Sequence, residues 1–306
     1  MLSPALPSPI TKKKISEARV QHRMLVSTEW LTQHLHDPDL VLLWVTSSSG
    51  YQAKSRIPGS RVIRLSDISM TRDDIPNELA PDEQLHRVFA AAGVTDRSRI
   101  VIYGERYGVL AARAYFTLDY LGLAGNAALL NGGLEKWRAE RRPQTDQPAA
   151  AEPQGVALLP IEPKAESESV RVTTPEMQQL LRSGALQPSI ALIDARPEDE
   201  YSGARLSGDV SKTGHLPGAT SLYWMELLLR RENPILLSDA ELRQRFIAAG
   251  AAPDKTVITY CRSGMQSSFD YFVAKYLGYR VRMYDASFFE WSWDDLPVER
   301  SAKSAR

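Results

Sequence analysis

The segment TVITYCRSGMQSSFDYFVAKYLG, residues 256–278, decides the fold class of this chain. Residues 256–260 are apolar and β-prone, and apolar residues then recur at helical spacing at Phe269, Phe272, Val273, Tyr276 and Leu277. The pattern predicts a strand, a loop that begins at Cys261, and a helix. Open α/β sheets place their ligands in such loops, because the N–H groups of the following helix point toward them.

A similar pattern occurs in the first half of the chain. Four segments match at an offset of about 150 to 159 residues, namely 42–46 with 192–196, 57–60 with 216–219, 100–104 with 257–261, and 120–122 with 276–278. Each copy places a strand before a Pro-Gly turn and a second strand before a helix, over 108–121 in the first copy and 266–277 in the second. The sequence therefore predicts two α/β domains, each with a mostly parallel sheet flanked by helices.

Composition supplies the boundaries. A length of 306 residues suits two domains, and 43% hydrophobic and 24% charged residues are typical of globular proteins. Segments rich in polar residues and proline predict a disordered arm over 1–23, an exposed linker over 144–169 and a tail over 301–306. The two domains are expected at 24–143 and 170–300.

Charge and hydropathy exclude several classes of partner. Lys+Arg and Asp+Glu are equal at 37 each, so no net field attracts nucleic acid or an anionic membrane. No apolar run approaches the roughly 18 residues that span a bilayer. The first twenty residues lack the apolar core of a secretion signal, which favours a cytoplasmic location, although a signal removed before residue 1 would make the protein periplasmic. The oligomeric state does not follow from the sequence.

Cys261 is the single cysteine of the chain, so it is either a buried inert thiol or a reactive one. The helix N–H groups and the neighbouring Arg262 both favour a thiolate. Gly264 allows the positive φ that a tight loop of inward-facing N–H groups requires. We therefore expect a reactive Cys261.

At this point the chain resembles a known family. The motifs Tyr260–Ser268, Asp194–Arg196 and Gly214–Ala219 together look like those of tandem rhodanese-domain sulfurtransferases, and bacterial thiosulfate enzymes in particular. Residues 131–137 also resemble the end of a rhodanese domain, with 285–291 as a degenerate second version. The resemblance covers roughly residues 24 to 300.

The resemblance implies an active C-terminal domain and an inactive N-terminal domain. Gly104 stands where the second copy has Cys261, and Glu105 replaces Arg262 with a charge of the opposite sign. The N-terminal domain is then expected to act as a structural partner that helps to wall the active cleft.

The resemblance also implies a persulfide on Cys261, which takes sulfur from thiosulfate and passes it to cyanide or a thiol without a metal or an organic cofactor. The donor would bind the loop residues Arg262, Ser263, Gly264, Met265, Gln266 and Ser267. Arg262 would hold the sulfonate group, because a planar guanidinium matches an anion with several oxygens. Asp194 and Arg196 are expected to support the loop as a buried pair, and His215 to bond the turn.

Three alternatives stay open. A 3-mercaptopyruvate sulfurtransferase shares the architecture and a serine like Ser263, but Glu200 stands where those enzymes carry a carboxylate-binding arginine, unless Arg205 reaches the same space. Gln266 departs from both classes of loop. A phosphatase of the related fold needs Cys-x5-Arg, and Ser267 occupies the arginine position. The third is a non-enzymatic sulfur carrier or binding module.

Overall fold

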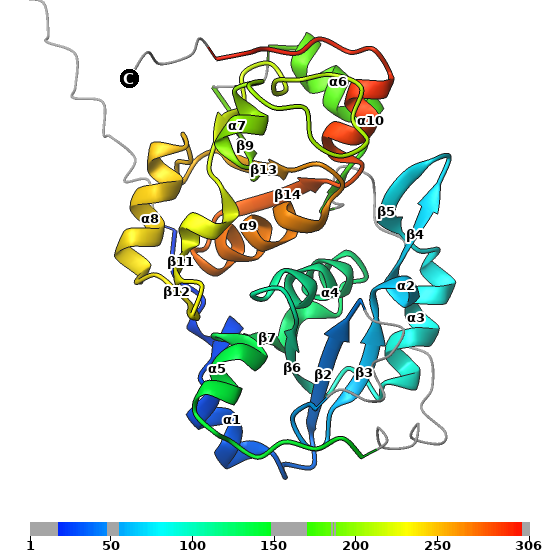
Figure 1. The fold of residues 1–306 in the computed structure, drawn as a ribbon, viewed down its shortest axis with the longest axis vertical. Helices are drawn as coiled ribbons and strands as arrows, with labels where there is room; N and C mark the ends of the chain where they lie inside the picture. The colour runs from blue at the N-terminus through cyan, green and yellow to red at the C-terminus, as the bar shows by residue number, and fades with distance from the viewer. Residues whose placement is uncertain (1–17, 48–54, 148–169, 185, 187, 302–306) are drawn as a thin grey trace, which may run out of the picture.

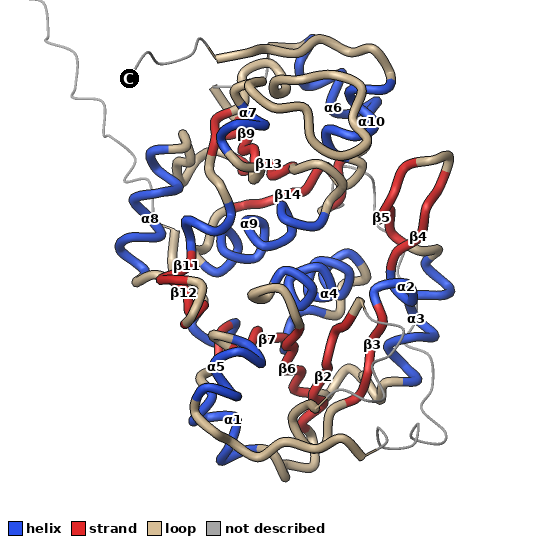
Figure 2. Tube along the Cα trace, in the orientation of Figure 1, coloured by secondary structure: helices blue, strands red, loops and turns tan. Residues whose placement is uncertain are grey.

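The computed structural model describes residues 18–47, 55–147, 170–184, 186 and 188–301, and shows two domains stacked along the long axis of the molecule (Figure 1). Each domain contains a five-stranded parallel sheet with helices packed against it (Figure 2), as the repeat predicted. Among the described residues, no helix is both long and apolar enough to cross a membrane.

The N-terminal domain has the strand order β1-β7-β6-β2-β3. Its sheet strands are β1 (Leu25–Val26), β2 (Leu40–Thr46), β3 (Arg61–Arg64), β6 (Arg99–Gly104) and β7 (Ala127–Leu130), and β4 (Ser69–Arg72) and β5 (Ile75–Leu79) form an antiparallel hairpin. Its helices are α1 (Thr28–His34), α2 (Leu65–Ile68), α3 (Asp82–Ala91), α4 (Val109–Tyr120) and α5 (Gly133–Ala139), with short 3-10 turns η1 (His22–Met24) and η3 (Ala124–Asn126).

The C-terminal domain repeats this topology, with the strand order β10-β9-β13-β14-β8. Its sheet strands are β8 (Arg171–Val172), β9 (Ile190–Asp194), β10 (Thr220–Ser221), β13 (Thr256–Tyr260) and β14 (Arg280–Tyr284), and β11 (Leu228–Arg230) and β12 (Asn233–Leu236) form its hairpin. Its helices are α6 (Thr174–Arg182), α7 (Glu198–Tyr201), α8 (Asp239–Ala248), α9 (Met265–Tyr276) and α10 (Ser287–Trp293), with the 3-10 turn η5 (Trp224–Leu227).

Two pairs of contacts confirm that the domains are copies. The Tyr103 hydroxyl at the end of β6 accepts a hydrogen bond from Ile57 N–H at 3.0 Å, and the Tyr260 hydroxyl at the end of β13 accepts one from Leu216 N–H at 3.1 Å. Likewise Trp137 and Trp291 each donate Nε1–H to a proline carbonyl at 2.7 Å. The strands that precede Gly104 and Cys261 are therefore equivalent, as the sequence predicted.

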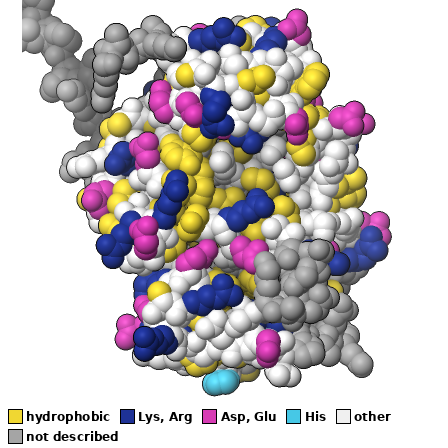
Figure 3. Space-filling view, viewed as in Figure 1, with side chains coloured by type: hydrophobic (Ala, Val, Ile, Leu, Met, Phe, Trp, Pro, Cys, Tyr) yellow, Lys and Arg dark blue, Asp and Glu magenta, His cyan; other side chains and the backbone are white. Residues whose placement is uncertain are grey.

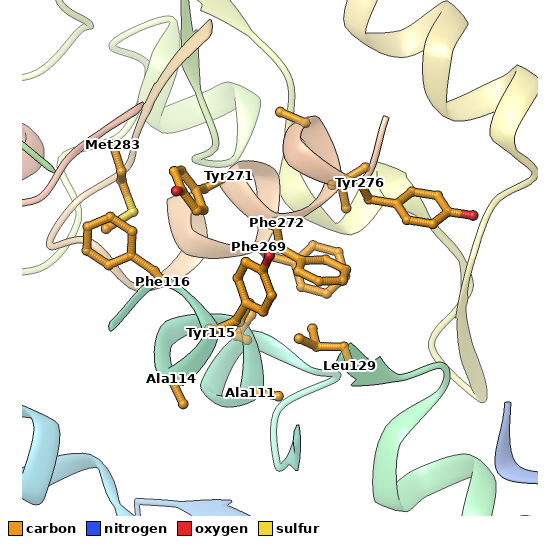
Figure 4. Packing of buried hydrophobic residues seen from close by; sticks show 14 of the residues in the cluster. Ala111, Ala114, Tyr115, Phe116, Leu129, Phe269, Tyr271, Phe272, Tyr276 and Met283 are labelled. Atoms are coloured by element: carbon orange, nitrogen blue, oxygen red, sulfur yellow. The ribbon is translucent and has the colours of Figure 1, made fainter. Parts of the chain in front are cut away.

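The two domains share one hydrophobic core, in which α4 packs against α9 (Figure 4). Tyr115 meets Phe272 edge to face with ring centroids 5.0 Å apart, and Phe116 meets Tyr271 at 5.1 Å. Such aromatic pairs contribute about 0.5–1.5 kcal/mol each beyond their buried area. This packing fixes the N-terminal end of α9, and with it the loop that holds Cys261.

Each hairpin reaches across to the other domain. The β4–β5 hairpin contacts the loop before α9, where Asn77 donates Nδ2–H to Ser263 Oγ at 3.0 Å. The β11–β12 hairpin contacts the equivalent end of the N-terminal sheet, where Leu236 N–H donates to Asn131 Oδ1 at 3.0 Å. The exchange is reciprocal, so each domain covers the carboxyl end of its partner's sheet.

The predicted boundaries need one correction. Residues 1–17, 148–169 and 302–306 lie outside the described residues, but residues 18–23, which the sequence assigned to a disordered arm, contact the C-terminal domain. Gln21 N–H donates to the Tyr276 carbonyl at 2.7 Å, and Arg243 Nη2–H donates to the Ala18 carbonyl at 2.9 Å. The first bond uses a carbonyl at the end of α9 and the second a carbonyl of the arm itself, contacts that the composition of the arm could not reveal. At the other boundary, Thr145 pairs with Arg56.

Candidate active site

Cys261 lies between the last residue of β13 and the first turn of α9, as predicted. The turn into the helix passes through Gly264 with φ 75°, where a Cβ atom would lie 2.8 Å from both the carbonyl and Oδ1 of Asp285. Glycine is therefore required at this position for its conformation and for its size. Strand β13 is buried and pairs in parallel with β9 on one side and β14 on the other, so the backbone that precedes Cys261 is held on both sides.

Ser287 secures the loop, and no local sequence pattern predicts this role. Its Oγ accepts hydrogen bonds from Cys261 N–H at 3.2 Å and Gly264 N–H at 3.1 Å, and donates to the Tyr284 carbonyl at 2.8 Å. In the same corner, Phe288 N–H donates to the Cys261 carbonyl at 3.0 Å. The loop is thus tied to the start of α10 at both ends.

The sulfur atom of Cys261 is enclosed. The residue is 1% exposed, and Ser267 Oγ–H donates to Sγ at 3.5 Å. The first N–H groups of α9 have no partner within the helix, and they lie directly after the loop, where they favour negative charge. A thiolate on Cys261 therefore has one hydroxyl donor and the positive end of a twelve-residue helix beside it.

Arg262 is engaged with the C-terminal domain itself. Its Nη2–H donates to Glu200 Oε1 at 2.5 Å and to Ser207 Oγ at 2.9 Å, and about a third of the side chain is exposed. Arg205 Nη2–H also donates to Glu200 Oε1, at 3.2 Å. The cation expected to hold the donor is therefore partly neutralised by the buried carboxylate of Glu200, the residue that replaces the arginine of mercaptopyruvate enzymes.

The other loop residues differ in their surroundings. Ser263 receives the hydrogen bond from Asn77 of the other domain, and Met265 is the first residue of α9. Gln266 is half-buried and lies on the first turn of that helix.

Asp194 and Arg196 satisfy each other, as expected of a buried pair. Arg196 Nε–H and Nη2–H donate to the Asp194 carboxylate at 3.0 and 2.6 Å, and Nη2–H also donates to the Gly214 carbonyl at 2.8 Å. The guanidinium lies 4.0 Å from the ring centroid of Phe288, next to the Cys261 loop. His215 was expected to bond the Pro-Gly turn, but its Nδ1 instead pairs with the Tyr201 carbonyl at 2.8 Å.

The N-terminal domain contributes a buried charged network at the loop. Arg113 of α4 forms a fully buried ion pair with Asp285 and donates Nη2–H to the Asn77 carbonyl at 2.5 Å. Arg171 pairs with Glu78 of β5 and lies 3.4 Å from Asp285. Burial, and next the charge of Asp285, raises the pKa of Glu78 to about 7. The N-terminal domain, which was expected to help wall the active cleft, thus does so through specific contacts.

At the equivalent place in the N-terminal domain there is no room for a nucleophile. A Cβ atom on Gly104 would lie 2.9 Å from the Val45 carbonyl oxygen and 3.1 Å from the backbone nitrogen of Ala111. A pocket at this place is lined by Gly104, Gly132 and residues of the β11–β12 hairpin. Glu105 accepts a hydrogen bond from Thr46 at 3.3 Å.

Comparison with known proteins fits this arrangement. The rhodanese-like domain family matches residues 27–140 and again 173–293, the two copies seen in the structure. The chain belongs to the rhodanese family. It is a tandem-domain member of these sulfurtransferases with a single cysteine, placed in the second copy.

Curated relatives match over nearly the whole length of this rhodanese chain. A protein of Azotobacter vinelandii named thiosulfate sulfurtransferase is 33% identical over 272 residues, which cover 88% of this chain and 94% of the relative. A protein of Thermus thermophilus named sulfur carrier protein TtuD is 30% identical over 278 residues, with 88% and 93% covered.

Solved structures share the fold of this rhodanese. The Tum1 protein of Saccharomyces cerevisiae superposes with a TM-score of 0.76 at 20% identity, covering 90% of this chain and 97% of that one. A 3-mercaptopyruvate sulfurtransferase from Leishmania major superposes with a TM-score of 0.72 at 17% identity, covering 90% and 76%.

Proposed function

We propose that this protein transfers the sulfane sulfur of thiosulfate to cyanide or to a thiol, through a persulfide on Cys261. The observation that carries the proposal is the position of Cys261 Sγ, which receives a hydrogen bond from Ser267 at the amino end of α9. A hydroxyl donor and helix N–H groups stabilise an anionic sulfur in the manner of a preorganised anion site.

The cycle consists of two substitutions at sulfur. In the first, the Cys261 thiolate attacks the outer sulfur of thiosulfate, a bond from Sγ forms, and the electron pair of the broken bond leaves with sulfite. In the second, the acceptor attacks the outer persulfide sulfur, and the electron pair of the bond to Sγ returns to Cys261 as thiolate. Loop residues 262–267 bind the donor, and Asp194 with Arg196 supports the loop.

Thiosulfate is favoured over 3-mercaptopyruvate by the charges next to Arg262. Glu200 stands in place of the arginine that would bind a carboxylate, and Arg205, the residue that could replace that arginine, is held by Asp199 at 2.5 Å as well as by Glu200. The name of the Azotobacter relative supports the same choice. We expect a higher kcat/KM with thiosulfate than with 3-mercaptopyruvate. The opposite order would reverse the choice of donor.

Intact mass spectrometry tests the proposal. Incubation with thiosulfate should add one sulfur atom to the protein, and cyanide should remove it with release of thiocyanate. Cys261→Ser should keep the fold, judged by circular dichroism, and lose both steps, because a hydroxyl is a far weaker nucleophile. Thiocyanate production by that variant would contradict the mechanism. Loading without repeated turnover would favour the sulfur-carrier alternative, which the name of the Thermus relative also keeps open.

A further inference from the structure

A second ionisable group lies at the sulfur site, and the cycle above does not use it. Asp270 of α9 is fully buried, and neither carboxyl oxygen has a hydrogen-bond partner in the described structure. It lies three residues after Ser267 on the same helix, a spacing that places two side chains on one face, and Ser267 contacts Cys261 Sγ. An ionised carboxylate without partners is too costly to bury in this position.

Among the described residues, the charged groups around Asp270 include no compensating cation. The acidic groups that act on it are Cys261, just after β13, Asp194 of β9 and Glu226 of η5. Arg196, next to Asp194, is already paired with it. Burial raises the pKa of Asp270 well above its ordinary value, and the charges of Cys261 and Asp194 add to this effect.

In the described structure, cations on α9 and on the elements near it are engaged elsewhere, Arg280 of β14 and Arg243 of α8 by backbone carbonyls and the others by ion pairs. These ion pairs join Arg113 of α4 to Asp285, Lys275 of α9 to Asp119 of α4, Arg282 of β14 to Glu176, and Arg245 of α8 to Glu226 of η5. The carboxyl group of Asp270 therefore sits among anions and apolar side chains.

We propose that Asp270 is a proton-bearing partner of Cys261, a neutral carboxylic acid that keeps its proton while the sulfur beside it is anionic. As a positioning residue it acts through the charge of the site. A carboxylate there would repel thiosulfate and cyanide, which are anions, whereas the neutral acid adds no negative charge beside Cys261. No bond to Asp270 forms or breaks during sulfur transfer.

This inference rests on the proposed role of Cys261, but it is tested by protonation and not by turnover. Infrared spectra of the full chain should contain, at neutral pH, the C=O stretching band of an un-ionised carboxyl group that Asp270→Asn lacks. Glu78, whose pKa is about 7, absorbs in both proteins, so the band is read from the difference between the wild-type and variant spectra. Asp239→Asn, which removes a carboxylate that bonds Tyr276 at the far end of α9, should keep the band. Absence of the band from the difference spectrum would overturn the proposal.

Coupling to the sulfur is measured with Cys261→Ser, which replaces an anionic neighbour by a neutral one. The band should then disappear at a lower pH than in the wild-type protein, because proton affinity falls when a nearby negative charge is removed. An unchanged midpoint would overturn the partnership. This comparison does not need the Asp270→Asn variant, so it remains decisive even if that variant fails to fold.

Alkylation of the single cysteine supplies a third readout. The ratio of the iodoacetate rate to the iodoacetamide rate reports local charge, because both reagents attack the same thiolate and only one is an anion. At neutral pH the ratio should be equal in the wild-type protein and in Asp270→Asn. A ratio about threefold or more lower in the wild-type protein would mean that Asp270 is ionised there, which contradicts the proposal.

Discussion

At the residue scale, the charge next to Cys261 is set by a balance between Arg262 and Glu200. Arg262 donates a hydrogen bond to Glu200, so part of its positive charge is neutralised within the domain. A hydrogen bond to a charged group contributes about 1.5–3 kcal/mol, and about 1.4 kcal/mol is tenfold in affinity. We expect Arg262→Ala to raise the KM for thiosulfate roughly tenfold, the lower end of that range. Steady-state kinetics with thiosulfate and cyanide measure this.

The opposite change should follow from Glu200→Gln. It removes the anion shared by Arg262 and Arg205 and leaves their positive charge available to a dianion, so the KM should fall. Glu105→Ala, at the equivalent place in the N-terminal domain, should leave the kinetics nearly unchanged. If both Arg262→Ala and Glu200→Gln raise the KM, the pair orders the loop and does not bind the donor.

Gly104 allows a separate test of the prediction that the N-terminal domain is inactive. Gly104→Cys places a Cβ against backbone atoms of Val45 and Ala111, so overpacking should lower the free energy of unfolding by about 1–3 kcal/mol. Combined with Cys261→Ser, it should bind no sulfur from thiosulfate, as measured by intact mass. A persulfide at position 104 would show that the first copy lost only its nucleophile.

Residue-level chemistry could be predicted where it depends on the local chain. The loop from Cys261 to Gly264, the positive φ of Gly264 and the buried Asp194–Arg196 pair follow from short motifs. Contacts made over long sequence separation could not be predicted, and Ser287 with the Cys261 loop is one of them. Asp270 does leave a signal in the sequence, since it is an acid among the apolar positions of a predicted helix.

At the element scale, the β4–β5 hairpin is the least predictable part of the site. The predicted helices over 108–121 and 266–277 agree with α4 and α9 to within a residue or so at each end, because apolar spacing and an entry glycine define them locally. Nothing local shows that a hairpin of the first domain reaches the loop of the second. That contact depends on how α4 and α9 pack.

Asn77 provides the test of this hairpin. It has φ 62°, so Asn77→Gly removes the hydrogen bond to Ser263 without straining the backbone. Losing one neutral hydrogen bond costs about 0.5–1.5 kcal/mol, and we expect kcat/KM to fall about two- to tenfold with little change in Tm. Ser263→Ala and the double variant complete a cycle. Strictly additive losses would show that the two side chains do not act together.

At the scale of the whole molecule, the junction between the domains carries both apolar and ionisable groups. Apolar side chains gather where the domains meet on the face shown in Figure 3, with basic side chains beside them. Inside the junction, Glu78 of the first domain pairs with Arg171 of the second. Because the contact between the domains buries this carboxyl group, the protonation of Glu78 is coupled to the association of the two domains.

The pH dependence of stability should report that coupling. The pKa of Glu78 is about 7 in the folded protein and 4.5 without the fold, so the folded state binds the proton more tightly. Its contribution to stability is full below pH 4.5 and is lost as the pH rises through 7. We expect Glu78→Gln to flatten the fall in the free energy of unfolding, measured in urea, over this window.

Glu140→Gln is the matched control. The pKa of Glu140 is lowered to about 2 by its bonds to Lys136 and Thr28 despite partial burial, so it stays ionised throughout the window. Its replacement should shift the free energy of unfolding by the same amount at every pH tested. If Glu78→Gln leaves the slope of the free energy of unfolding against pH unaltered, the pH dependence belongs to other groups.

One consequence follows from the enclosed and solitary thiol. These 306 residues contain no second cysteine, so a persulfide on Cys261 has no internal thiol that could resolve it to a disulfide. Discharge requires a molecule from outside, and reagents must reach a sulfur that is 1% exposed. The lifetime of the persulfide form is therefore set by the supply and the shape of acceptors. Oxidation by peroxide should end at the sulfenic, sulfinic or sulfonic acid of Cys261 and not at an intramolecular disulfide.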